Sequence, residues 1–150
     1  MKKISVVAAL FTDRDRFLVT QRKLGGSFGG FWEFPGGKVE TGESDEVALA
    51  REIEEELGVR CDVGTLFSAL THDYPDFQLD FRVYRCRWLD GEWRPLGVAD
   101  LRWITIDQID GLLFPPADKP ILAALKAVDD VRESSTIDGS PRLPRATVNS

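Results

Sequence analysis

Apolar residues recur along the chain with two different periods, and these periods predict its secondary structure. Runs rich in β-branched and aromatic residues predict strands at residues 4–12, 17–22, 61–70, 77–88 and 101–106. The charged residues 13–16 lie between the first two runs and favour a hairpin turn there. Because helical segments are interspersed with these strands, the pattern indicates the α/β class.

The clearest helical pattern covers residues 45–57, which contain no glycine or proline. Ser44 is the predicted N-cap, and Gly58 is the predicted C-cap. At about 100° per residue, one apolar stripe is expected. It consists of Val47, Ala50, Ile53 and Leu57.

A second helix is predicted at residues 117–128, where Ile121, Leu122 and Leu125 repeat at helical spacing. Residues 129–150 are rich in serine, proline and charge and nearly devoid of large apolar side chains, which predicts a flexible C-terminal tail. We therefore expect one folded domain over residues 1–128, followed by a tail over residues 129–150.

The composition narrows the functional classes. The chain of 150 residues is long enough for one domain, and its net charge of −6 disfavours nonspecific binding to long nucleic acid. No stretch approaches the length of a membrane span, so no membrane association is expected. Cys61 and Cys86 lack metal-site spacing and are expected to be reduced thiols of a cytoplasmic protein, with a disulfide between them as the lesser alternative.

The helix at residues 45–57 carries a cluster of carboxylates. Glu52, Glu55 and Glu56 fall on one face, where they repel one another. Mg²⁺ or Mn²⁺ would relieve this repulsion, since these ions take oxygen ligands and share them with phosphates. A solvated acidic face is the simpler interpretation of three glutamates alone. Further residues at fixed spacing favour the metal site: Gly37, Glu43, Arg51 and Gly58.

Together these residues form a pattern over residues 37–59 that resembles the Nudix box, the signature of the Nudix hydrolases. Every defined position is filled: Gly37, Glu43, Arg51, Glu52, Ile53, Glu55, Glu56, Gly58 and Val59. The resemblance implies the Nudix α/β/α sandwich with a mixed central sheet. It also implies catalysis through Glu52, Glu55 and Arg51, with Mg²⁺ as cofactor and Mn²⁺ as the alternative.

The resemblance assigns roles within the box. Glu52, Glu55 and Glu56, with Gly36, would hold the metal. Arg51 would fix the carboxylates by a charge-assisted hydrogen bond, and Glu43 would support them. Either Glu55 or Glu52 would be the general base. Gly36 and Gly37 would let the backbone turn tightly beside the phosphates.

Beyond the box, residues 2–128 are most similar to MutT-like nucleoside triphosphate pyrophosphohydrolases, including the CTP pyrophosphohydrolase branch. By this resemblance Arg22 would contact phosphate and sugar, and Asp118 would read the base. The segment leading into the box would complete the substrate site with Phe34, Gly36, Gly37 and Lys38. The expected partner is a small nucleotide, bound by a monomer or a homodimer.

Two positions depart from the family. MutT has Asn where this chain has Asp118. An ionised Asp only accepts hydrogen bonds, which favours the amino group of cytosine over 8-oxo-dGTP. Alternatively, Asp118 caps the last helix. The second departure is Gly97, where many relatives carry a glutamate that binds metal or acts as base. Asp100 is the nearest acidic residue that could replace it.

Some aromatic residues have two interpretations. Trp32, Phe34 and Phe77 could stack on a base, although each is more typical of a core. His72 is the only histidine, and its loop position is more typical of a turn than of a catalyst. The glycine-rich residues 23–31 predict a mobile loop.

The implied reaction converts a nucleoside triphosphate and water into a nucleoside monophosphate and pyrophosphate, with attack at the β phosphorus. Its expected role is sanitation of the nucleotide pool, with CTP, dCTP, 5-methyl-dCTP or 8-oxo-dGTP as substrate. Two alternatives stay open: hydrolysis of another nucleoside diphosphate derivative, and a noncatalytic nucleotide-sensing module on the same fold.

Overall fold

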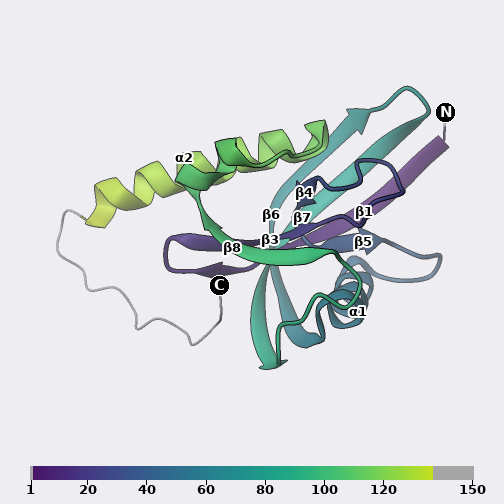
Figure 1. Ribbon diagram of the computed structural model, residues 1–150, viewed down its shortest axis with the longest axis horizontal. Helices are drawn as coiled ribbons and strands as arrows, with labels where there is room; N and C mark the ends of the chain where they lie inside the picture. The colour runs from purple at the N-terminus through teal and green to yellow at the C-terminus, as the bar shows by residue number, and fades with distance from the viewer. Residues whose placement is uncertain (1, 137–150) are drawn as a thin grey trace.

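The computed structural model describes residues 2–136, with side chains described through residue 128. Its strands form two four-stranded sheets that lie between two helices (Figure 1). The first sheet has the order β5 (Gly36–Lys38), β1 (Lys2–Leu10), β7 (Phe77–Gly91), β6 (Val59–Asp73). In the second, β3 (Arg16–Gln21) pairs with β2 (Thr12–Asp13), β4 (Trp32–Glu33) and β8 (Asp100–Thr105).

The first sheet is mixed. Strand β1 runs parallel to β7, with Lys2 opposite Phe77, and antiparallel to β5. The remaining strand pairs are antiparallel. The predicted hairpin at residues 13–16 is present, since β2 and β3 pair around a turn. The α/β class with a mixed sheet is confirmed.

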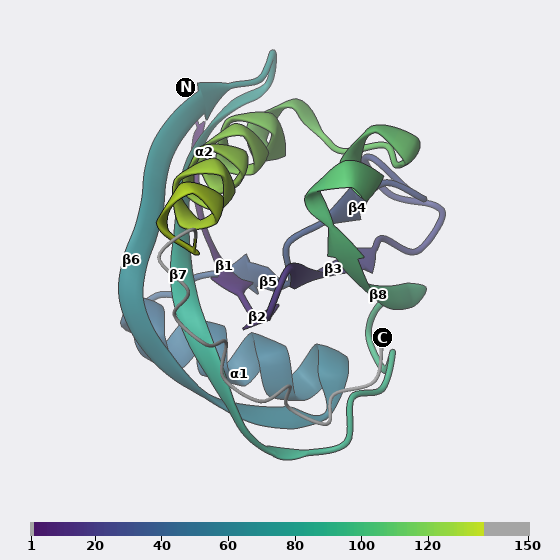
Figure 2. The same cartoon turned by 90° about the vertical axis from the view of Figure 1, so that its left-hand side faces the viewer.

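The hairpin of β6 and β7 is long and curved. Three register irregularities interrupt its pairing, one of them between Arg60 and Cys61. Such bulges bend a strand and increase its twist. Figure 2 shows the result, because β6 and β7 sweep along one side of the molecule from α2 to α1.

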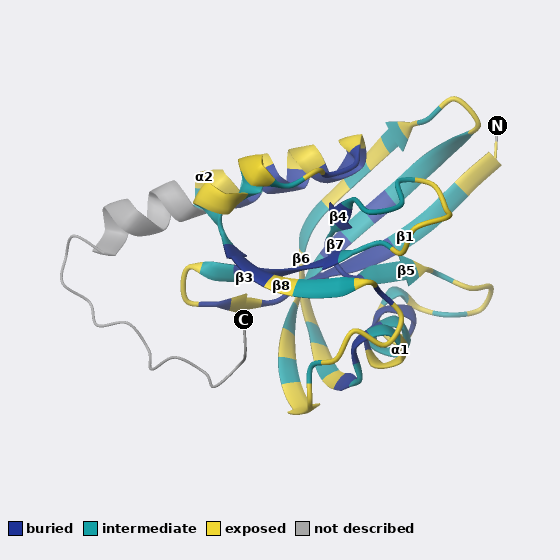
Figure 3. Ribbon diagram, viewed as in Figure 1, coloured by how far each residue is buried: buried dark blue, intermediate teal, exposed yellow. Residues whose placement is uncertain are grey.

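Helix α1 (Asp45–Leu57) and helix α2 (Lys119–Thr136) cover opposite sides of the sheets (Figure 2). Figure 3 shows that the described part of α2 turns its buried side toward the sheets and its exposed side outward. Strand β1 serves both cores through its alternation: Val7 and Ala9 pack toward α1, whereas Ala8 and Leu10 belong to the core beneath α2. Two short 3₁₀ helices, Ile106–Gly111 and Pro116–Asp118, lead from β8 to α2. No helix among residues 2–136 is long and apolar enough to cross a membrane.

Helix α1 begins and ends as predicted, but its buried face differs from the prediction. The Ser44 hydroxyl accepts a hydrogen bond from the Val47 N–H at 3.2 Å, and Gly58 is left-handed at φ 73°. Val47 is nevertheless 59% exposed. The buried residues are Ala48, Leu49, Ile53 and Leu57.

The buried face of α1 differs from the predicted face because Glu52 and Glu56 follow Ala48 at intervals of four residues. These carboxylates therefore occupy part of the face that is turned toward the sheet. The predicted end of α2 is also corrected. The helix continues past Val128 to Thr136, so the predicted tail begins inside it. The rest of that tail, residues 137–150, lies outside the described residues, so its predicted flexibility stays a prediction.

Candidate active site

Arg51 is the centre of a carboxylate network on helix α1, shared with the loop before it. Its Nε and Nη2 donate to the two oxygens of Glu43 at 2.8 and 2.9 Å. Its Nη1 donates to Glu52 at 2.9 Å and to Glu55 at 3.4 Å. The hydrogen bonds from Arg51 lower the pKa of Glu43 to about 2. The predicted contact between Arg51 and the carboxylates is present.

The two glycines of β5 make room for this network. A Cβ atom on Gly37 would lie 2.4 Å from the Glu52 carboxyl carbon, and one on Gly36 would lie 2.0 Å from the Val7 carbonyl oxygen. Both residues are part of a strand paired with β1. The expected tight turn is therefore wrong. Glycine is needed here because neighbouring groups approach too closely for a side chain.

Glu56 differs from the other carboxylates of α1, since one of its oxygens is both buried and unpaired within the described part of the chain. Its Oε1 is buried and unpaired among the described residues. Burial, followed by repulsion from Glu52 and Glu33, raises the pKa of Glu56 to about 8. An ionised carboxylate at this position would therefore require a compensating positive charge.

The departure at Gly97 has a steric explanation. The Gly97 N–H donates to the Glu56 carbonyl oxygen at 3.0 Å. A Cβ atom on Gly97 would lie 3.2 Å from both Cα and Cγ of Glu56. Because the loop touches Glu56 so closely, a side chain at residue 97 would have to displace it.

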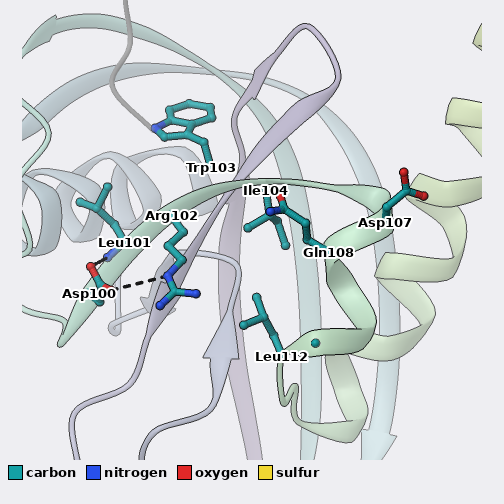
Figure 4. Close-up of a pocket in the computed structure, with 9 residues that line it drawn as sticks. Asp100, Leu101, Arg102, Trp103, Ile104, Asp107, Gln108 and Leu112 are labelled. Carbon is teal, nitrogen blue, oxygen red and sulfur yellow. Dashed lines mark hydrogen bonds and ion pairs between the residues drawn. The ribbon is translucent and has the colours of Figure 1, made fainter.

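Asp100, the suggested replacement, has other partners. It accepts a hydrogen bond from the Leu101 N–H at 2.8 Å and lies 3.7 Å from the Arg102 Nε. Figure 4 shows Asp100 with Arg102 in a hollow of about 650 Å³ beside β8. Arg102 in turn lies 4.7 Å above the Trp32 ring. Asp100 thus belongs to a surface ion pair.

A second polar group lies around Arg22 and Asp118. Arg22 Nε donates to Glu33 at 2.9 Å, and its Nη1 donates to the Ser27 carbonyl oxygen at 3.0 Å. Burial raises the pKa of Glu33 despite this partner. Glu33 was missed by sequence reasoning. Its position between Trp32 and Phe34, two buried aromatic residues, was the available signal.

Asp118 is 4% exposed and accepts a hydrogen bond from the Phe34 N–H. Its Oδ1 has no partner among the described residues. Burial, followed by repulsion from Glu33, raises the pKa of Asp118 to about 8. The carboxyl group therefore faces the segment between β4 and β5, and its contact with a base stays a prediction.

The aromatic residues divide between core and surface. Trp32 and Phe34 are buried, and Phe34 packs on Phe17 at 5.9 Å between ring centroids. The Phe34 ring thus belongs to the core, and its contact with a substrate stays a prediction. Phe77 and His72 both pack against Tyr74, at 5.1 and 4.6 Å. The Lys38 side chain is exposed, while its carbonyl oxygen accepts from Arg51 at 3.3 Å.

The donors of α1 fit a hard divalent cation in their chemistry. All are carboxylate oxygens, the ligand type that Mg²⁺ and Mn²⁺ prefer. The buried, unpaired Oε1 of Glu56 is the strongest indication of such a ligand. No three acidic, histidine or cysteine side chains within residues 2–136 already stand in a metal-binding arrangement. Arg51 instead engages Glu52 and Glu55.

These features define a Nudix hydrolase, and the chain belongs to the NUDIX domain family, whose model matches residues 6–124. It is 30% identical to the 8-oxo-dGTP diphosphatase of Escherichia coli, over 84% of this chain and 98% of that protein. It is 32% identical to the CTP pyrophosphohydrolase of the same organism, over 88% and 98%.

Solved structures agree with the sequence relatives. The solution structure of the Escherichia coli ORF135 protein superposes with a TM-score of 0.76 at 31% identity, over 88% of this chain and 94% of that one. The MutT Nudix hydrolase from Burkholderia pseudomallei gives 0.71 at 29% identity, over 83% and 98%. Nudix hydrolases generally require a divalent metal ion.

Proposed function

We propose that this protein is a nucleoside triphosphate pyrophosphohydrolase that uses Mg²⁺, with Mn²⁺ as the alternative. One water molecule cleaves the bond between the α and β phosphates, and the products are a nucleoside monophosphate and pyrophosphate. The observation that carries the proposal is the network on α1, in which Arg51 orders Glu52 and Glu55 next to the unpaired oxygen of Glu56.

The three glutamates of α1, with the Gly36 backbone, are the proposed metal ligands. A divalent cation held by them would neutralise phosphate oxygens and increase the acidity of a water molecule. Glu55 is the proposed general base. Its side chain is 59% exposed and its bond to Arg51 is long at 3.4 Å, whereas Glu52 is 18% exposed and held at 2.9 Å. Glu55 is thus the carboxylate most free to accept a proton.

The substrate is proposed to lie between α1 and the group around Asp118. Arg22 and Lys38 would contact phosphates, with the backbone of Gly36 and Gly37 beside them. Asp118 would read the base. With its pKa raised to about 8, the buried carboxyl is mostly protonated at neutral pH and can donate as well as accept. Cytosine nucleotides and 8-oxo-dGTP both fit such a group.

The named activities of the relatives support this substrate class, and they suggest sanitation of the nucleotide pool as the role. A cytoplasmic location and a monomeric or homodimeric state belong to the same proposal. Neither is needed for the chemistry on α1.

The test is a pyrophosphate-release assay with Mg²⁺ on a panel of CTP, dCTP, 5-methyl-dCTP, 8-oxo-dGTP, dGTP, ADP-ribose and dinucleoside polyphosphates. We expect turnover of a triphosphate, with monophosphate and pyrophosphate in equal amounts. Release of orthophosphate, or a preference for ADP-ribose or dinucleotides, would contradict the proposal. Metal-independent binding without turnover would instead indicate a nucleotide sensor.

A further inference from the structure

Cys61 and Cys86 lie outside the site described above, on neighbouring strands of the β6–β7 hairpin. In the strand register Cys61 is opposite Trp88, and Val63 is opposite Cys86. Residues opposite one another, and residues two apart on one strand, share a face of the sheet. The two thiols are therefore diagonal neighbours on one face. Both pack beside the core beneath α1.

The two side chains already reach one another. The Cys61 and Cys86 thiols interact with each other, and the Cys86 thiol donates a hydrogen bond to the Tyr84 carbonyl oxygen at 3.6 Å. The bulge between Arg60 and Cys61 bends β6 beside this pair. This contact lowers the pKa of Cys61 and raises that of Cys86. Cys61 is thus the more nucleophilic thiol at neutral pH.

The two cysteines differ in their access to solvent. Cys61 lines a surface hollow of about 200 Å³, whose other walls are Ala50, Arg51, Glu54 and Arg60. Both arginines of this hollow already have carboxylate partners: Arg51 belongs to the network on α1, and Arg60 lies 3.4 Å from Asp90. Cys86 does not line the hollow. A reagent would therefore meet Cys61 first.

We propose that Cys61 and Cys86 form a reversible thiol–disulfide site that reacts with small disulfides such as oxidised glutathione. The Cys61 thiolate attacks one sulfur of the reagent, a mixed disulfide forms and one reduced thiol leaves. Cys86 then loses its proton and attacks the Cys61 sulfur, which releases the second thiol. Two protein thiols become one disulfide, and one molecule of the reagent is reduced to two thiols.

The experiment is to incubate the full chain in glutathione buffers of increasing oxidised fraction, then alkylate the remaining thiols and weigh the protein. We expect both thiols to disappear together, with a net loss of two hydrogen atoms and no bound glutathione. Peptide mapping should join Cys61 to Cys86 within one chain, and dithiothreitol should reverse the change. Two thiols that persist in the most oxidised buffer, or a link between two chains, would overturn the proposal.

Two matched variants test the order of events. Cys86→Ser should stop at the mixed disulfide, with one glutathione on Cys61. Cys61→Ser should react at least about tenfold more slowly, because its remaining thiol, Cys86, does not line the hollow. Equal rates in the two variants would overturn the assignment of Cys61 as the first thiol to react. These readouts do not depend on hydrolase activity.

Discussion

Two groups of acidic side chains meet at the site, and they differ in how their charges are compensated. In the first group, Arg51 binds Glu43 through two hydrogen bonds and also binds Glu52. The pKa of Glu43 is accordingly lowered to about 2. In the second group, Glu56 and Asp118 each have a buried oxygen without a partner among the described residues, and the pKa of each is raised to about 8.

This difference indicates two roles: the Arg51 group supports the site, and the second group recognises the ligand. The Arg51 group is complete without a ligand, so it fixes the direction of the α1 carboxylates before any substrate arrives. The second group holds polar atoms whose burial is unfavourable unless a ligand supplies a cation or a hydrogen-bond partner. We therefore expect changes at Asp118 to alter which substrate is chosen, and changes at Glu56 and the other glutamates of α1 to alter turnover.

The largest effect is expected for Glu55→Gln, which keeps the shape of the side chain and removes the proposed base. Turnover of the best triphosphate should fall by about 10²-fold or more. Glu54→Gln is the matched control, because Glu54 is an exposed neighbour on the same helix. Its turnover should stay within about twofold of the original. Near-normal turnover in Glu55→Gln would remove Glu55 from the mechanism.

A smaller effect is expected for the choice of base. Below about pH 8 the Asp118 carboxyl is protonated and can donate, and above that pH it only accepts. The ratio of kcat/KM for dCTP over 8-oxo-dGTP should therefore rise as the pH increases through 8. One such hydrogen bond is worth about 1.5–3 kcal/mol, so the change should be about tenfold to a hundredfold.

Asp118→Asn should flatten this pH profile, and it should shift preference toward 8-oxo-dGTP above about pH 8, where Asn still donates and an ionised Asp118 does not. It should also change stability in a defined direction. Since the folded-state pKa of Asp118 lies above that of an ordinary carboxyl, its contribution is complete below the ordinary pKa and is lost as the pH rises through about 8. Denaturant unfolding at several pH values measures this. An unchanged ratio at every pH would show that the base is read elsewhere.

At the start of α1 the charges are again paired. A substitution there is expected to lower the stability of the fold without changing which substrate is preferred. Arg82 donates to both oxygens of Asp45, at 2.6 and 2.8 Å, and also to Asp80. Arg82→Ala would leave two carboxylates short of a partner and should lower the free energy of unfolding by about 1–3 kcal/mol. In urea titrations, the exposed pair of Arg87 with Asp62 provides the control. Arg87→Ala should change stability by less than about 1 kcal/mol.

The smallest effect is expected outside both groups. A chain that ends at Thr136, the last residue of α2, should melt within a few degrees of the full chain and keep its turnover. Differential scanning calorimetry and the pyrophosphate assay measure the two quantities. Loss of folding would show that residues 137–150 contribute to the packed structure.

Features set by local sequence could be predicted, and features set by distant packing could not. The caps Ser44 and Gly58, and the contact of Arg51 with nearby carboxylates, depend on residues close along the chain. The exposure of Val47 depends on which face of α1 meets the sheet. Likewise, the close approach of Gly36 to β1 and the burial of Asp118 arise from contacts between segments far apart in sequence. No pattern within one sequence predicts such contacts.

The parallel pairing of β1 with β7 has a consequence for biosynthesis. Lys2 meets Phe77 and Leu10 meets Arg85, so β1 must wait for a strand 75 residues further on, the difference between 77 and 2. At roughly 5–20 residues per second, a ribosome needs several seconds to make that strand. During this interval only β5 can pair with β1. The edge of β1 that later pairs with β7 stays unpaired, and an unpaired apolar edge favours aggregation. The helix that carries the hydrolytic carboxylates therefore completes its core only after most of the domain has left the ribosome.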